Sequence, residues 1–204
     1  MREPSVRPYR PTDLDAVYDI CVRTADAGGD ARGMYASDRL MGDLFAAPYV
    51  TLEPAHAFVV DDGTGHAVGY IVGTADTARF VDRYRHEWIP QTADRCPMPA
   101  DPPATADDLM LGLHHEPERM LIPDLPDDPA LLHIDVLPEW QGRSWGRRLI
   151  AQFLQSLSAV GVPAVHLGMV ATNTAARGFY DRLGFTQLRA EPPVVYLVRD
   201  TSPL

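Results

Sequence analysis

One short segment, 136–149, gathers the residues best suited to chemistry. In a chain of formal net charge −10 it holds two glycines and three arginines, namely Gly142, Arg143, Gly146, Arg147 and Arg148. Its pattern predicts a strand, a glycine-containing turn and a helix. A helix N-terminus offers unpaired N–H groups and roughly half a positive charge, which suits a pyrophosphate, and glycines let a ligand approach the backbone. An ordinary strand–turn–helix connection with solvated arginines is the alternative.

The elements that must position this segment follow from hydrophobic periodicity. Strands are predicted at 6–10, 57–60, 67–73, 131–136, 164–169, 185–188 and 194–198. Helices are predicted from Thr12 to near Gly28, within 30–50, from Asp76 through Trp88, at 144–160 and at 174–183. Residues 76–130 are rich in Pro and Asp, so we expect an irregular insertion within one domain covering 1–204.

Composition narrows the class of protein. The negative charge argues against nucleic acid as a partner. No apolar run approaches a membrane span and no signal segment opens the chain, so we expect a cytoplasmic protein. Cys21 and Cys96 have no partner at a metal-ligand spacing and are expected as reduced thiols, Cys21 within the core. The His114–Glu116 cluster lacks a third ligand, so we expect no metal. The oligomeric state is not predicted.

The segment after Val136 resembles the pyrophosphate loop of the GNAT superfamily of N-acetyltransferases, Gln/Arg-x-x-Gly-x-Gly/Ala. Gln141 and Gly146 match it, and Ser144 stands where the family has its middle glycine. The resemblance implies acetyl-CoA as cosubstrate. It also implies that the following residues surround the pyrophosphate: Gly142, Arg143, Ser144, Trp145, Gly146 and Arg147. The Ser144 N–H can still donate, but its Cβ lies where it would crowd the phosphate.

A second motif follows the strand at 164–169. Residues 173–185 are similar to the family's Asn-x-x-Ala-x-x-Phe-Tyr-x-x-x-Gly-Phe, with Asn173 and Tyr180 two turns apart on one helix face. The resemblance implies that Asn173 bonds the pantetheine arm and that Tyr180 protonates the leaving thiolate. From the residues alone, Asn173 also suits a helix N-cap, and Tyr180 can be a core aromatic beside Phe179.

The resemblance implies an α/β (α+β) fold with a mixed, mostly antiparallel central sheet of about seven strands. Its central strands splay apart, helices cover both faces, and here a large insertion precedes the coenzyme-binding strand. By position, Ile134, Asp135 and Val136 form the edge that pairs with the pantetheine amides. The hairpin, the Trp88 helix, the proline-rich insertion and 132–135 are similar to one GNAT subgroup: bacterial free-standing relatives of the acetyltransferase-like C-terminal domain of O-GlcNAcase.

The implied reaction is direct attack of an amine, on a small molecule or a protein, upon the acetyl thioester. Backbone N–H groups near Val136 would polarise the carbonyl. Asp135 and His133 share one face of their strand, and either can act as the base; each can instead be a satisfied core residue. Asp26 and Asp30 can contact a cationic acceptor or be ordinary loop acids. The alternative function is a non-catalytic acetyl-CoA-binding or interaction module.

Overall fold

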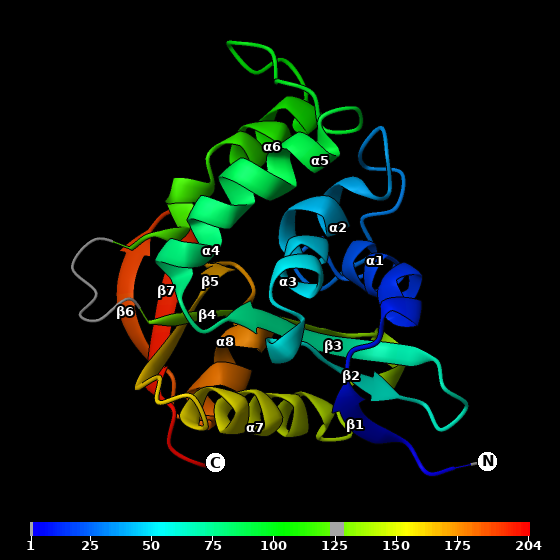
Figure 1. The fold of residues 1–204 in the computed structure, drawn as a ribbon, viewed down its shortest axis with the longest axis vertical. Coiled ribbons are helices and arrows are strands. Elements are labelled where there is room, and N and C mark those ends of the chain that lie inside the picture. The colour runs from blue at the N-terminus through cyan, green and yellow to red at the C-terminus, as the bar shows by residue number, and fades with distance from the viewer. Residues whose placement is uncertain (1, 123–128) are drawn as a thin grey trace.

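A seven-stranded sheet in the order β1-β2-β3-β4-β5-β7-β6 forms the centre of the computed structural model, which describes residues 2–122 and 129–204 (Figure 1). The strands are β1 (Ser5–Pro8), β2 (Phe58–Asp61), β3 (Ala67–Thr74), β4 (Ala130–Val136), β5 (Ala164–Val170), β6 (Thr186–Glu191) and β7 (Val194–Asp200). Every neighbouring pair is antiparallel except β4 and β5, which are parallel. The predicted mixed, mostly antiparallel sheet is therefore confirmed.

Helices cover both faces of the sheet, also as predicted. They are α1 (Leu14–Val22), α2 (Leu40–Phe45), α3 (Ala47–Leu52), α4 (Thr77–Arg83), α5 (Ile89–Thr92), α6 (Ala106–His115), α7 (Trp145–Ser158) and α8 (Thr174–Arg182). Helices α1 to α6 lie on one side, and α7 and α8 on the other (Figure 1). Among the described residues, none of these helices has the length and apolarity to cross a bilayer.

Helix α7 shows why this arrangement is stable. Its apolar residues recur at helical spacing and make one continuous stripe. They are fully buried against the sheet: Leu149, Ile150, Phe153, Leu154 and Leu157. Because this stripe packs on β1 to β4, the N-terminus of α7 is held at the end of β4.

Helix α1 ends earlier than the sequence predicted. It stops at Val22 rather than near Gly28, and the Thr24 hydroxyl bonds the carbonyl of Ile20 at 2.8 Å, where the chain turns. The carboxylate of Asp13 does not cap α1 but pairs with Arg7, at 2.7 Å. The chain after α1 folds back toward α8.

The insertion is more regular than its composition indicated. Asp76 caps α4 as predicted, accepting a hydrogen bond from the Arg79 N–H at 2.9 Å. The irregular excursion expected beyond Trp88 is wrong for 106–115, which form α6. A capping box begins this helix, with Thr105 and Asp108 bonding each other's N–H groups. The Thr-x-x-Asp pattern was readable, but the surrounding prolines masked it.

Candidate functional site

The two central strands, β4 and β5, separate at one end of the sheet. β4 pairs with β5 only at Ala130 and Leu131, although β3 pairs with β4 as far as Val136. The Leu137 N–H donates to the Val68 carbonyl on β3. Because main-chain groups alternate in direction along a strand, those of Ile134 and Val136 point away from β3, to the open edge.

Residue Asp135 contributes to this edge differently from its two neighbours. Asp135 is two residues before Leu137, so its main-chain groups point the same way, to β3, where Tyr70 is its register partner. In the predicted edge of Ile134, Asp135 and Val136, the main-chain groups of Ile134 and Val136 are therefore open, whereas those of Asp135 face β3.

The loop between β4 and α7 is held back against the end of the strand. The Gln141 side chain donates to the Val136 carbonyl at 2.9 Å. Gly142 has φ +71° and Ser144 has φ +63°, so the chain makes two left-handed steps before α7 begins. No described residue accepts from the N–H groups of Trp145, Gly146 or Arg147. These N–H groups are free to bind an anion.

Positive charge surrounds this helix end. Arg143, Arg147 and Arg148 are exposed, and none forms an ion pair with a described carboxylate. The guanidinium of Arg143 lies 5.5 Å from the ring centre of Trp140, and that of Arg148 lies 4.6 Å from the ring centre of Trp145. Such stacking orders the arginines without neutralising them. The loop is a positive site on an acidic protein.

Two residues of the loop behave differently from the sequence interpretation. Ser144 occupies a left-handed conformation that favours glycine, so the family's glycine has a backbone reason here, besides leaving room for a phosphate. A Cβ on Gly146 would lie 2.9 Å from Cζ of Phe179 on α8. The missing side chain of Gly146 therefore lets α7 and α8 pack together.

Asn173 and Tyr180 both come from α8. The Oδ1 of Asn173 accepts from the Ala176 N–H at 3.0 Å, so the N-cap interpretation holds. Its Nδ2 keeps two donors, which are not used in the cap. That amide faces the loop after α1, since a Cβ built on Gly28 would lie 3.8 Å from it.

Tyr180 is almost completely buried between two aromatic rings. Its ring centre lies 5.2 Å from that of Phe179 and 5.4 Å from that of Phe185, so it is part of the core. No described residue forms a hydrogen bond with its hydroxyl. Burial raises the pKa of Tyr180 above its ordinary value, and the charge of Asp135 raises it further. Tyr180 and Asp135 thus share one electrostatic environment.

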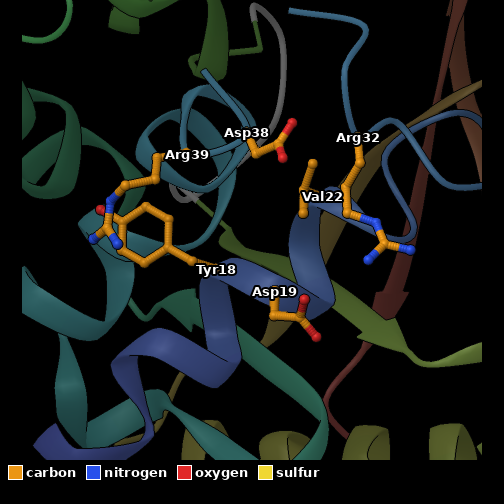
Figure 2. A pocket seen from close by; sticks show the side chains of 6 residues that line it. All are labelled: Tyr18, Asp19, Val22, Arg32, Asp38 and Arg39. Atoms are coloured by element: carbon orange, nitrogen blue, oxygen red, sulfur yellow. The ribbon is translucent and has the colours of Figure 1, made fainter.

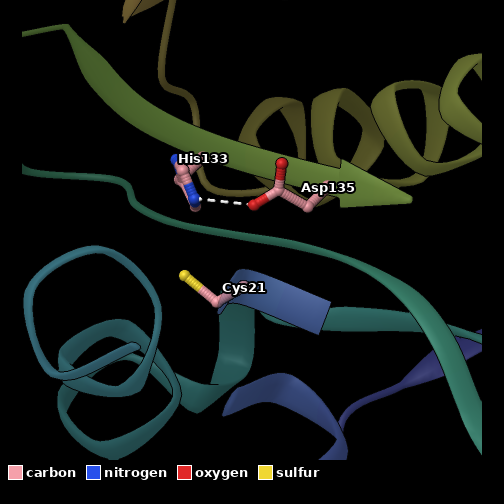
Figure 3. Close-up of side chains that lie close together, drawn as sticks. All are labelled: Cys21, His133 and Asp135. Atoms are coloured by element: carbon pink, nitrogen blue, oxygen red, sulfur yellow. Dashed lines mark ion pairs between the residues drawn. The ribbon is translucent and has the colours of Figure 1, made fainter. Parts of the chain in front are cut away.

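A polar cluster lies between β4 and α1 (Figure 3). The Tyr70 hydroxyl donates to Oδ2 of Asp135 at 2.6 Å, and Nε2 of His133 lies 3.0 Å from the same oxygen without hydrogen-bond alignment. His133 and Asp135 share a face, as predicted. Cys21 is buried, as predicted, but its position beside them was missed, as was that of Tyr70. Short-range sequence pattern carries no signal for such long-range neighbours.

Other polar groups considered from the sequence are engaged elsewhere. Asp30 pairs with Arg32 at 2.5 Å, and this contact lowers the pKa of Asp30 to about 2. His114 is bonded to the hydroxyls of Tyr84 and Thr92, at 2.8 and 3.0 Å. His115 lies within hydrogen-bond distance of the Cys96 carbonyl. Asp30 and both histidines serve local structure.

A small hollow of about 180 Å³ opens between α1 and the chain at 32–39 (Figure 2). It is lined by Tyr18, Asp19, Val22, Arg32, Asp38 and Arg39. It is smaller than the cavities that usually hold cofactors. None of the predicted site residues lines it, so the candidate site remains the open edge of β4 and the start of α7.

Comparisons with known proteins agree with this geometry. The family model described as Acetyltransferase (GNAT) family matches residues 32–185. The crystal structure of SsHAT is 56% identical, covers 98% of this chain and 99% of that chain, and superposes with a TM-score of 0.95. PaiA N-acetyltransferase from Thermoplasma acidophilum, in complex with coenzyme A, shares the fold at 10% identity, with a TM-score of 0.60 over 97% of this chain and 99% of that one.

The Protein O-GlcNAcase of Rattus norvegicus is 28% identical over 182 residues, or 88% of this chain. The resemblance to O-GlcNAcase predicted from the sequence is therefore confirmed. The chain spans only about a fifth of that protein's length, because the match covers 20% of it.

Proposed function

The chain belongs to the acetyltransferase (GNAT) family, and we propose that it binds acetyl-CoA and transfers the acetyl group directly to an amine acceptor. The observation that carries this proposal is the limited pairing of β4 with β5, at Ala130 and Leu131 alone, beside the unpaired N–H groups that begin α7. An extended chain of amides can pair with such an edge as a missing strand does.

Each part of the coenzyme then has a matching part of the site. The pantetheine amides pair with the main-chain groups of Ile134 and with the carbonyl of Val136, and the Nδ2 of Asn173 donates to the same arm. The pyrophosphate takes the N–H groups from Trp145 to Arg147, where the helix dipole and nearby arginines favour negative charge. This assignment uses the unpaired donors of the site and breaks no bond described above.

The chemistry begins with the acceptor. The amine nitrogen attacks the thioester carbonyl carbon, and the carbonyl oxygen takes the negative charge. The Val136 N–H, on the open edge, donates to that oxygen. Asp135 accepts the proton of the attacking nitrogen, directly or through water, while Tyr70 holds its carboxylate at 2.6 Å.

The carbon–sulfur bond then breaks and the thiolate leaves. Tyr180 donates a hydrogen bond to the departing sulfur and delivers the proton that yields free CoA. Because its pKa is raised, while a free thiol has a pKa near 8.5, most of its effect comes from hydrogen bonding to the developing charge rather than from its acidity. No covalent acyl-enzyme is formed.

Calorimetric titration with acetyl-CoA, and with free CoA for comparison, tests the first half of the proposal. Micromolar binding is expected. Absence of heat at millimolar coenzyme would rule out the proposed enzyme. Amine acceptors would then be screened by the release of free CoA.

Substitution of Tyr180 tests the second half. Tyr180→Phe removes the hydroxyl that meets the leaving sulfur and keeps the packed ring. We expect turnover to fall by roughly 10²-fold, within the range for acid–base groups, with little change in coenzyme affinity. Tyr9→Phe, which removes a tyrosine hydroxyl beside the edge strand β1 and far from the site, is the control. An unchanged rate in Tyr180→Phe would remove this residue from the mechanism.

A non-catalytic acetyl-CoA-binding module is the second candidate. It is favoured by the strained Ser144 in the loop and by the engagement of the Asp135 carboxylate with Tyr70. This candidate predicts coenzyme binding in calorimetry, but no release of free CoA with any amine and no effect of Tyr180→Phe. The two experiments together therefore separate the candidates.

A further inference from the structure

The cluster beneath α1 holds three side chains of different chemistry within a small space. The Sγ of Cys21, a ring nitrogen of His133 and a carboxylate oxygen of Asp135 all lie within 4.8 Å of one another (Figure 3). Thiolate, imidazole and carboxylate are the groups that bind zinc in proteins. The three residues come from α1 and β4, so only the folded chain assembles them.

The distances are close to those that a single ion needs. Three donors no more than 4.8 Å apart have a common point within about 2.8 Å of each, and zinc bonds to these donors at roughly 2.0–2.3 Å. A shift of about half an ångström per side chain closes the difference, which rotamer adjustment can supply. A fourth position is left for water, as in zinc sites with three protein ligands.

The charges also match a divalent cation. A Cys21 thiolate and the Asp135 carboxylate carry two negative charges, and His133 is neutral when it binds a metal, so a buried Zn²⁺ complex has no net charge. The Nε2 of His133 is buried and has no hydrogen-bond partner among the residues that the structure describes, so it is available as a ligand.

The surroundings hold the ligands in place yet leave a route to solvent. The Tyr70 hydroxyl bonds Asp135 at 2.6 Å, in the manner of the outer partners that orient metal ligands. The His133 ring stacks on Phe45, 5.9 Å between centres. The side chains of His133 and Asp135 are 33% and 19% exposed, so an ion can enter from their side although Cys21 is buried.

We propose that Cys21, His133 and Asp135 form a site for a divalent transition-metal ion such as Zn²⁺, and that an ion bound there withdraws Asp135 from acetyl transfer. Binding displaces the Cys21 thiol proton to solvent as the metal–sulfur bond forms. The inhibitory consequence rests on the proposed function, whereas the binding itself does not.

Cobalt titration of the whole chain tests the binding. Co²⁺ is expected to give a thiolate-to-cobalt charge-transfer band at one equivalent, and Zn²⁺ to remove it by competition. Cys21→Ser should abolish the band, and Cys96→Ser, at the other buried cysteine, should retain it. Tyr70→Phe, which removes only the outer partner, should weaken affinity by roughly 10- to 100-fold. His133→Gln, at a side chain that is not fully buried, gives a ligand loss that does not depend on a core cysteine.

The outcomes are separable from those of the acetyltransferase. A folded protein that shows no thiolate–cobalt band at millimolar Co²⁺, or one that keeps the band in Cys21→Ser, overturns the site. Zn²⁺ inhibition of CoA release that a chelator reverses, and that Cys21→Ser relieves, supports the consequence. If no acetyl transfer is ever detected, the cobalt band still decides the site.

Discussion

Replacing Gly146 with alanine adds one methyl group where two helices touch. In the sequence this glycine belongs to the pyrophosphate-loop motif, but in the structure the position that its Cβ would occupy faces α8. A Cβ there would lie 2.9 Å from Cζ and 3.1 Å from Cε2 of Phe179. Such contacts are shorter than carbon atoms tolerate, so either the aromatic ring or α7 must move.

The size of the effect follows from two opposing terms. Overpacking of this kind costs about 1–3 kcal/mol. Alanine in a helix regains up to about 1 kcal/mol over glycine, and less in a first turn. We therefore expect Gly146→Ala to lower the free energy of unfolding by about 1 kcal/mol, which lowers the Tm by roughly 2–4 °C for a chain of this length.

Gly178→Ala on α8 is the matched control. Its Cβ would meet only Nη1 of Arg182, at 3.4 Å, the mobile end of a flexible side chain. This variant should gain stability of about 0.5–1 kcal/mol from helix propensity. Thermal and urea unfolding of both variants, with acetyl-CoA titration of each, measure the difference. Phe179→Leu combined with Gly146→Ala should recover part of the loss, as a coupled pair does.

The expected clash is contradicted if Gly146→Ala stabilises the protein as much as Gly178→Ala does. Phe179 would then not occupy the space assigned to it. If Gly146→Ala keeps the wild-type Tm but loses coenzyme binding, the glycine serves the ligand, and the original sequence interpretation is the better one.

Two further predictions concern strain and pH. Ser144→Gly should raise the free energy of unfolding, measured by urea titration, by up to about 1 kcal/mol, because glycine removes the backbone strain of a serine in the left-handed conformation. Ser144→Ala keeps that strain and should not raise it. Equal effects of the two substitutions would place the cause outside the backbone. Burial lowers the pKa of His114 and of His166 from an ordinary 6.5 to about 4. As the pH falls, the unfolded chain therefore binds protons before the folded protein does, so the free energy of unfolding has its full value above pH 6.5 and falls by roughly a few kcal/mol toward pH 4. His114→Gln should remove about half of this pH dependence, measured by urea unfolding at several pH values. An unchanged pH dependence would contradict the assignment.

Much of the fold could be read from local pattern. The strands were found because alternating apolar residues and glycine-rich turns mark them, and α7 because its apolar stripe has helical period. The end of α1 differs from the prediction, since the helix stops at Val22 and the chain turns before it reaches Gly28. Helix α6 was missed because its capping box lies among prolines. Local errors of this kind arise where one side-chain hydrogen bond outweighs a propensity.

The candidate site divides in the same way. The family motifs, the Asn173 cap and the shared face of His133 and Asp135 can be read from the sequence, because they depend on residues near one another along one element. The folded chain is needed to see that β4 separates from β5 after Leu131, that Gly146 packs against Phe179, and that Cys21 and Tyr70 lie beside Asp135. Those facts depend on how separate elements approach in space, and packing between elements leaves no periodic signal in the chain.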